Sequence, residues 1–323
     1  MWIHLLLITG SAVALAQVPQ IAGLGLSALP LAILLGMLYG NLYPTKGNDE
    51  GAVNWCQRRA LRLGIVLFGF NLSLQQVAAL GWQLVLVDTL VICVVLAVGI
   101  GVGMRLLGLS RELAVLTSVG SAVCGAAAIA AAEPVARARE QDVAVAVATV
   151  VLFGTLATFC YPLIYSLCGW EESVFGIYIG STVHEVAQAV AAGQSIGADA
   201  MQSALVAKLV RVMLLAPVVV FLGSVLFRAR GGERRGAPAP LPGFVFGFAL
   251  AVGLNSVLVL PQALQTVLQL ASQGLLALGM AALGVKARWR SIRSAGARPL
   301  LLSSLLFLLL LGGGFVLNAY FYR

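Results

Sequence analysis

The chain consists largely of apolar segments, about 17 to 25 residues long, which is the length of a helix that crosses the ~30 Å hydrocarbon core of a membrane. Only helices satisfy their own backbone hydrogen bonds in lipid, and the short alternating strands of a β-barrel are not seen. The sequence therefore predicts an all-α polytopic membrane protein with about 11 transmembrane helices. The expected segments are Trp2–Ala16, Leu24–Tyr43, Ala60–Leu74, Leu84–Met104, Leu113–Ala132, Val143–Leu167, Phe175–Ala192, Ala204–Leu226, Phe244–Leu260, Leu264–Val285 and Leu300–Asn318.

Composition supports this class, because 60% of the residues are hydrophobic, 10% are charged, and the mean hydropathy is +0.99. The net charge of +8 does not indicate a nucleic-acid partner, since the basic residues lie in short connections between apolar segments. The five cysteines form no CxxC pair and are interpreted as small apolar residues. We expect a lipid bilayer as the surroundings, and neither a cofactor nor a metal.

The first segment has two interpretations. It is short and ends in Ala14-Leu15-Ala16, which resembles a signal-peptidase site. However, the residues before it include no Lys or Arg, which a signal peptide normally has. We therefore expect residues 1–17 to be a retained accessory helix.

The basic residues are distributed unequally between the two sides of an eleven-span topology. Fifteen fall on the side of the N-terminus and three on the other, so the positive-inside rule predicts a cytoplasmic N-terminus and a periplasmic C-terminus. The fifteen are Lys46, Arg58, Arg59, Arg62, Arg105, Arg111, Arg228, Arg230, Arg234, Arg235, Lys286, Arg288, Arg290, Arg293 and Arg298, and the three are Arg137, Arg139 and Arg323.

The ten remaining segments divide into two sets of five, residues 24–167 and 174–318. Their fourth members start 151 residues apart and their fifth members 157 residues apart. Because five is odd, the two sets would have opposite orientations, as in the inverted repeats of many secondary transporters. The sequence thus predicts one membrane transport domain built from two inverted repeats and the N-terminal helix.

The fourth members share small and polar residues near mid-span. A matched pair of Gly-interrupted segments indicates broken helices around a binding site, although close helix packing through small residues is the alternative. We expect two broken, crossing helices, with breaks near Ser118–Gly125 and Ala271–Gly279. The candidate substrate-binding residues are Ser118, Gly120, Ser121, Cys124 and Gly125 in the first and Ser272, Gln273 and Gly274 in the second.

Two other segments also carry charged and polar side chains, and His184 in one of them lies at the same depth as the small-residue stretches. His184, Ser121 and Gln273 lie eight or nine residues into their segments, near the bilayer midplane. Buried ionisable groups at this depth are costly, at about 2.5–3.5 kcal/mol each, and usually functional. We therefore add His184, Gln188, Lys208 and Arg211 to the candidate substrate-binding residues, and assign proton coupling to His184 and Glu185.

Lys208 and Arg211 are three residues apart and share a helix face. Glu185 or Asp88 could pair with one of these cations, and a bound anion with the other. The alternatives are a purely structural ion pair, or a lysine that extends to the membrane surface.

The sequence HEVAQ, which starts at His184, also resembles the zinc-protease motif HExxH. Gln188 occupies the position of the second zinc ligand, and the only other histidine is His4. A zinc site needs three protein ligands, so we expect no metalloprotease and no enzyme.

Four stretches together resemble the YeiH family, the sulfate exporter family of bacteria: GSAVCGAAAIAAAEPV, LFGTLATFCYPLIY, GIYIGSTVHEVAQAVAAG and AKLVRVMLLAP. The resemblance covers about Leu24 to Asn318. It implies the fold of the wider cation/proton antiporter and anion transporter superfamily, with two inverted five-helix repeats and crossed broken helices. It also implies an inner-membrane secondary transporter that forms a homodimer.

The residues and the resemblance predict transport of a small, sulfate-like anion. The chain has no GxxxxGK[ST] motif for ATP, so we expect an ion or proton gradient to drive transport. A cation/proton antiporter of the same fold is one alternative, but such proteins centre on paired acidic residues. A channel or structural membrane subunit is another.

Overall fold

The computed structural model describes residues 1–18, 28–43, 47–75, 81–226, 243–258, 260–287 and 296–322. Every regular element in these ranges is a helix. The elements are α1 (Trp2–Ala16), α3 (Ala28–Leu42), α4 (Gly47–Trp55), η1 (Cys56–Ala60), α5 (Leu61–Phe68), η2 (Gly69–Asn71), α7 (Gln83–Arg105), α8 (Arg111–Ala122), α9 (Ala126–Ala136), α10 (Glu140–Cys168), α11 (Glu172–Thr182), α12 (Val186–Gln194), α13 (Ala198–Met213), α14 (Leu215–Phe221), η3 (Leu222–Leu226), α15 (Gly243–Val257), α16 (Gln262–Lys286) and α18 (Ala297–Tyr322).

Five helices in the described part of the chain are long and apolar enough to cross a membrane. They are α7, α10, α16, α18 and the continuous stretch Ala198–Ser224 that contains α13 and α14. Four shorter apolar helices accompany them, at Trp2–Ala16, Ala28–Leu42, Ala126–Ala136 and Phe246–Val257. The prediction of an all-α membrane protein is confirmed.

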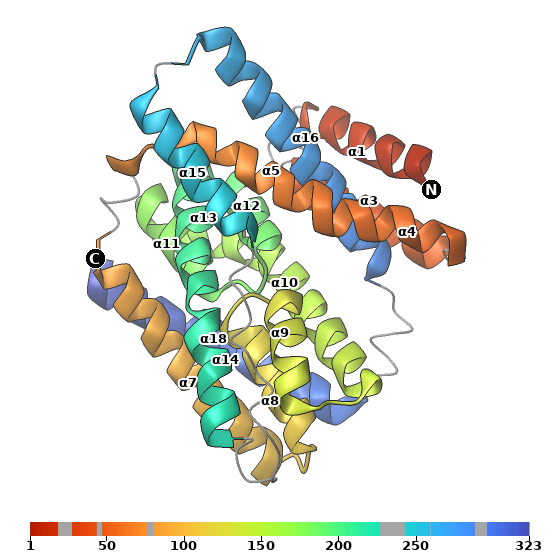
Figure 1. Ribbon diagram of the computed structural model, residues 1–323, viewed down its shortest axis with the longest axis vertical. Helices are drawn as coiled ribbons and strands as arrows, with labels where there is room; N and C mark the ends of the chain where they lie inside the picture. Colours follow the sequence, from red (N-terminus) through yellow and green to blue (C-terminus); the bar gives the residue numbers. More distant parts are fainter. Residues whose placement is uncertain are drawn as a thin grey trace.

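The helices form two groups according to their contacts, and the groups overlap in part in the view of Figure 1. The first, here the α3/α16 group, contains α1, α3, α4, α5, α15 and α16, with α16 packed on α3 and α5 and α15 packed on α5. The second, here the hairpin group, contains α7 to α14 and α18. Contacts between the groups involve mainly α12, which touches α3 and α16, and α10, which touches α3.

The predicted break near Ala271–Gly279 is wrong, because α16 is one continuous helix of 25 residues. Its glycines serve close packing instead. A Cβ atom at Gly284 would lie 2.2 Å from the carbonyl oxygen of Ile33, and one at Gly36 of α3 would lie 2.3 Å from that of Ala281. The alternative interpretation of the small residues is therefore correct for this segment.

The break in the first small-residue segment is present, at residues 123–125 between α8 and α9. The chain does not continue across the membrane after it, however. A Cβ atom at Gly120 of α8 would touch Ile129 of α9, so the two helices pack against each other. Arg139, which follows α9, interacts electrostatically with Glu112 in the first turn of α8. Helices α8 and α9 thus form a hairpin that returns to the side it came from, rather than a crossing broken helix.

A second hairpin lies where the sequence predicted an uninterrupted helix. Helix α11 ends at Thr182 and α12 begins at Val186, so the break contains Val183, His184 and Glu185. Gly176 near the start of α11 and Gly193 near the end of α12 both lie against Ala200 of α13. The second hairpin therefore consists of α11 and α12, and its tip carries the polar cluster of the sequence.

The two hairpins enter the hairpin group from opposite ends. Helix α10 connects them: the first hairpin ends where α10 begins, and the second begins where α10 ends. Both tips reach the middle of α10, since Gly120 contacts Val150 and Gln188 bonds to Val151 and Thr155. The interior of the membrane-spanning bundle is thus the place where two helix interruptions meet.

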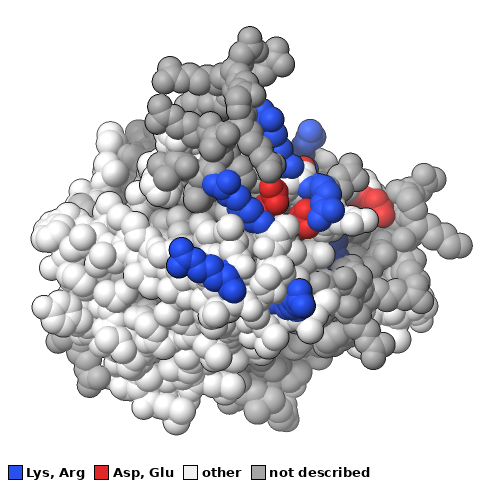
Figure 2. Space-filling view, turned by 90° about the horizontal axis from the view of Figure 1, so that it is seen from below, with Lys and Arg blue, Asp and Glu red and all other residues white. Residues whose placement is uncertain are grey.

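The basic side chains gather at one end of the molecule. Figure 2 views the molecule from the lower end of Figure 1, where α7 ends and α8 begins, and shows Lys and Arg together with a few acidic residues on a face whose other described residues are uncharged. Several predicted basic positions, including Lys46, Arg228–Arg235, Arg288–Arg293 and Arg323, lie outside the described residues.

Candidate functional site at the hairpin tips

The carboxylate of Glu185 joins the two hairpin tips. Its Oε1 atom accepts a hydrogen bond of 3.2 Å from the backbone N–H of Ala126, the first residue of α9. The same side chain caps α12 in a capping box, in which the amide of Gln188 accepts the N–H of Glu185 at 3.2 Å. One negative charge therefore serves the positive N-terminal ends of two helices.

Arg211 serves the opposite ends, the C-termini of α8 and α11. Its Nε donates to the carbonyl of Ala122 at 2.6 Å, one Nη to Ser121 at 3.0 Å, and the other Nη to Ser181. Lys208 donates its ammonium group to the carbonyl of Val183, the residue after α11. Both cations are fully buried and stabilise carbonyls that have no partner within their own helices.

Two glycines make room for this arrangement. Gly125 has φ +68°, and a Cβ atom there would lie 2.4 Å from Cγ of Glu185. Both its backbone conformation and its contact with the carboxylate thus require glycine. On α10, a Cβ atom at Gly154 would lie 1.9 Å from the amide oxygen of Gln188, so this glycine lets Gln188 reach the carbonyl of Val151 at 3.3 Å.

Several buried polar atoms around the tips have no hydrogen-bond partner among the described residues. They include both ring nitrogens of His184, the hydroxyls of Thr117 and Ser121 on α8, and both carboxylate oxygens of Asp88 on α7. Buried polar groups in proteins are almost always bonded to protein, water or ligand. A cluster of such atoms beside two cations is therefore a candidate binding site.

The structure brings together most of the residues predicted for the site. Ser121, Cys124 and Gly125 at the first tip meet His184, Glu185 and Gln188 at the second, with Lys208 and Arg211 beside them. Ser118 and Gly120 lie within the last turns of α8. The hydroxyl of Ser118 donates to the carbonyl of Ala114 at 2.6 Å, and Gly120 packs on α9 and α10.

The three candidates on α16 are placed elsewhere. Ser272 donates to the carbonyl of Gly64 on α5 at 2.8 Å, within the α3/α16 group. Gln273 is half-buried. Gly274 is exposed, and a Cβ atom added there would have no neighbour within 4 Å. Ser272 thus bonds to α5, and α16 has no break at these residues.

Other residues support the second tip and were not predicted from the sequence. Asn318 of α18 donates to the hydroxyl of Ser181 at 3.1 Å, and Tyr161 of α10 donates to that of Thr182 at 2.8 Å. For Asn318, the sequence does offer a signal that could have identified it, namely a polar residue in an apolar segment. These bonds fix the end of α11, and with it the carbonyl of Ser181 that Arg211 contacts.

The first tip is open on one side. Ala127, the second residue of α9, is exposed, whereas residues 113–125 are buried. Glu185 keeps 8% of its surface. The start of α9 is thus the least enclosed part of the meeting point.

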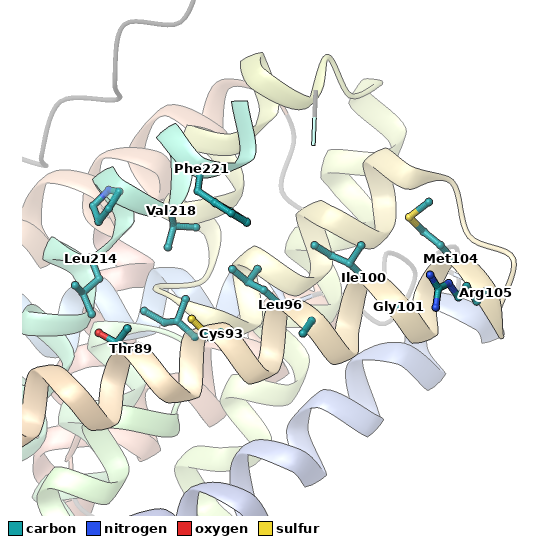
Figure 3. A pocket seen from close by; sticks show the side chains of 13 residues that line it. Thr89, Cys93, Leu96, Ile100, Gly101, Met104, Arg105, Leu214, Val218 and Phe221 are labelled. Atoms are coloured by element: carbon teal, nitrogen blue, oxygen red, sulfur yellow. The ribbon is translucent and has the colours of Figure 1, made fainter. Parts of the chain in front are cut away.

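A groove of about 690 Å³ lies between α7 and α14, away from the tips. Figure 3 shows its lining, in which Leu96 and Ile100 of α7 face Val218 and Phe221 of α14, with Arg105 at one end. The groove is mostly apolar, so it does not have the chemistry of a site for a hydrophilic solute.

Fold and site together define a polytopic helical membrane protein in which two hairpins meet tip to tip around buried charges. A family model described as Conserved hypothetical protein 698 matches residues 1–303. The chain belongs to this family, which includes YeiH.

The relatives in this family have similar length and are named membrane proteins. A UPF0324 membrane protein of Pseudomonas aeruginosa is 44% identical over 96% of this chain and 90% of its own length. The UPF0324 inner membrane protein YeiH of Escherichia coli K12 is 42% identical over 96% and 90%. The resemblance to YeiH is thus confirmed, and relatives are named as inner membrane proteins. No solved structure is similar to this chain.

Proposed function

We propose that the protein is a secondary transporter of a small, sulfate-like anion, and that the anion binds where the two hairpin tips meet. The observation that carries the proposal is the pair of fully buried cations, Lys208 and Arg211, beside unpartnered polar atoms at the meeting point. Charged groups inside a membrane protein are costly and typically line an ion or substrate pathway.

The two cations keep donors for a ligand. The ammonium group of Lys208 has further N–H groups besides the one it gives to Val183, and the guanidinium of Arg211 has further N–H groups besides its three backbone bonds. The hydroxyls of Ser121 and Thr117 and the ring of His184 supply neutral partners. Guanidinium and ammonium donors in a water-poor site bind anions strongly.

The way in which the charged groups are engaged favours an anion over a metal cation. Lys208 and Arg211 carry two positive charges, and Glu185 and Asp88 carry at most two negative ones. Of these carboxylates, Glu185 is engaged by the N-terminal ends of two helices. A cation/proton antiporter centres on paired acidic residues, whereas here each carboxylate has a buried Lys or Arg near it.

The hairpins also support a topology in which nine segments cross the membrane and two return to their own side. Arg137 and Arg139 then join the side of the N-terminus, so seventeen basic residues lie there and only Arg323 opposite. The positive-inside rule places the N-terminus in the cytoplasm and the C-terminus in the periplasm more strongly than the eleven-span count does. Each predicted repeat, 24–167 and 174–318, contains one hairpin, as the fourth segment of the first repeat and the first segment of the second.

Two further expectations belong to this proposal. Helix α1 packs on α3 and α16 with Leu5, Thr9 and Ala12 buried, which supports its role as an accessory helix of the transporter. The resemblance to the sulfate exporter family also implies a homodimer, which chemical cross-linking in the membrane would detect.

Liposomes loaded with sulfate test the proposal against a channel. Labelled sulfate outside should be taken up saturably and exchange with unlabelled sulfate inside, and sulfite and small sulfonates should compete. Arg211→Lys keeps the charge but loses the planar fork, so affinity should fall at least tenfold, while Arg139→Lys at the surface should behave as wild type. A sulfate conductance that does not saturate would indicate a channel, and no flux of any of these anions would contradict the anion class.

A further inference from the structure

Asp88 is a buried carboxylate beside the two cations of the proposed anion site, and it is not one of the anion's proposed donors. It lies six residues into α7, is fully buried, and neither of its oxygens has a hydrogen-bond partner among the described residues. A carboxylate that stays ionised in an apolar interior needs such partners. Asp88 therefore differs from Glu185, whose oxygens accept backbone N–H groups of two helices.

The surroundings of Asp88 contain both cations of the site. Leu84 packs against Ala207 of α13 and Ile177 of α11, and one helical turn further along both α7 and α13 brings Asp88 level with Arg211. Arg211 and Lys208 both attract the carboxylate electrostatically. No ion pair within 4.0 Å joins them in the described structure, so the carboxylate is near the cations without being bonded to them.

Tyr322 of α18 is the third polar group facing Asp88. Its hydroxyl is buried without a partner and interacts electrostatically with the carboxylate. Among the helices that pack on α7, α13 supplies Lys208 and Arg211, and α18 supplies Tyr322. Helices α8 and α11 also pack on α7, and they supply no further charged group that interacts with Asp88 in the described structure. Asp88 and Tyr322 lie near the beginning of α7 and the end of α18, which is the end of the molecule opposite to Arg105.

We propose that Asp88 is the site of the coupling proton, reached past Tyr322 from the C-terminal side of the membrane, and that its protonation frees Lys208 and Arg211 to bind the anion. This inference rests on the proposed function. With Asp88 ionised, two carboxylates neutralise the two cations. When the carboxylate takes up a proton and becomes a neutral acid, one positive charge is left for the anion. Proton and anion then bind together and are released together.

The two groups first assigned to proton coupling are less suitable. Protonation of Glu185 would weaken its hydrogen bonds to the starts of α9 and α12 and so loosen both tips. A positive charge on His184 would be a third cation beside Lys208, whose partner Val183 is the preceding residue. Glu185 is thus a positioning residue that holds the tips, and Asp88 is free to change its charge.

Sulfate binding to the purified protein, measured across pH, tests this inference. In the wild type, affinity should fall about tenfold per pH unit once Asp88 loses its proton, and sulfate addition should take up one proton per site. Asp88→Asn should bind sulfate equally well at low and high pH and take up no proton. Asp142→Asn, the matched control on α10, should keep the wild-type pH dependence.

Infrared difference spectra identify the proton carrier directly. Sulfate should produce the band of a protonated carboxylic acid in the wild type and in Asp142→Asn, a shifted band in Asp88→Glu, and none in Asp88→Asn. Tyr322→Phe should slow proton-driven uptake but leave equilibrium binding unchanged.

The outcomes separate this inference from the proposed function. An unchanged pH dependence in a folded Asp88→Asn protein, or an unshifted band in Asp88→Glu, would overturn the role of Asp88 while leaving the anion site intact. Absence of sulfate binding by the wild type at every pH would overturn the anion site, and the coupling proton with it.

Discussion

The contact between α3 and α16 and the meeting point of the hairpins use similar residues for opposite purposes. Both are rich in Gly, Ala and Ser, and both bring backbones unusually close. At the first, Gly36 and Gly284 let two continuous helices touch through their backbones. At the second, Gly125 and the residues around His184 interrupt two helices.

The two regions differ in the side chains that can bond to backbone N–H and carbonyl groups left without partners by a helix interruption. An interrupted helix leaves N–H and carbonyl groups without partners, which is costly in an apolar interior. At the tips, Glu185 supplies the acceptor and Arg211 and Lys208 supply the donors. Along α16, the described residues near Gly279 and Gly284 are apolar or backbone. Small residues therefore permit a break, and buried charges of the right sign make it stable.

The largest effect is expected from removing Arg211. Arg211→Gln leaves the carbonyls of Ser121, Ala122 and Ser181 with too few donors in the interior, so the free energy of unfolding should fall by about 3–5 kcal/mol. Thermal unfolding in detergent, followed by the fluorescence of buried tryptophan, measures this loss. Arg139→Gln is the matched control, because its side chain is 75% exposed and should leave the melting temperature unchanged. Equal melting temperatures for both variants would contradict the role of Arg211 in holding the tips.

The next largest effect is expected at Gly125. Gly125→Ala forces a residue with a Cβ atom into a backbone conformation that favours glycine and pushes it against Glu185, at a cost of about 2–3 kcal/mol. Because the displaced carboxylate also caps α9, anion uptake should fall by more than the loss of stability explains. Thermal unfolding and liposome uptake, measured on the same preparation, show both effects. Wild-type uptake by this variant would mean that the tip tolerates displacement of Glu185.

A smaller effect is expected where the glycine only permits close packing. Gly36→Ala places a methyl group against the carbonyl of Ala281, so α3 and α16 must separate slightly, which costs about 1–2 kcal/mol. Anion affinity should stay within about twofold of wild type, because the tips lie in the other helix group. If affinity fell as much as in Gly125→Ala, the two regions would not be independent.

The smallest effect is expected at Gly274, which is exposed on α16 and has no atom within 4 Å of an added Cβ. Gly274→Ala should stabilise the helix by up to about 1 kcal/mol, since alanine favours a helix interior. A loss of stability or of anion uptake would instead indicate that this part of α16 bends or binds the substrate, as the sequence had suggested.

The sequence predicted the class of fold and much of the site, for identifiable reasons. Long apolar segments require helices. Lys208, Arg211 and Glu185 could be recognised as candidates because ionisable groups at membrane depth are energetically costly and usually functional. The same reasoning could not tell a crossing helix from a hairpin, because a run of apolar residues has the same length whether it continues or turns back. That distinction depends on packing between α8 and α9 and between α11 and α12, which involves Ala, Gly and Ile rather than a recognisable motif.

The position of the second break also depended on partners far away in sequence. The stretch STVHEVAQ has helix-forming residues on both sides, and the local sign of an interruption is limited to Glu185 followed three residues later by Gln188. The break forms because Lys208, Arg211 and Asn318 provide bonds for the end of α11, while Glu185 and Gln188 cap the start of α12. The glycine-based prediction for α16 was wrong because it counted small residues and not the charges that an interruption needs.

Locating a bound anion would show whether the two hairpin tips form one anion site. Crystals of the protein grown with selenate, an electron-rich analogue of sulfate, would show its position by anomalous scattering at the selenium edge. We expect a peak between the tips, within hydrogen-bond distance of Lys208 or Arg211. A peak found only elsewhere, such as beside Arg105 in the groove between α7 and α14, would contradict it.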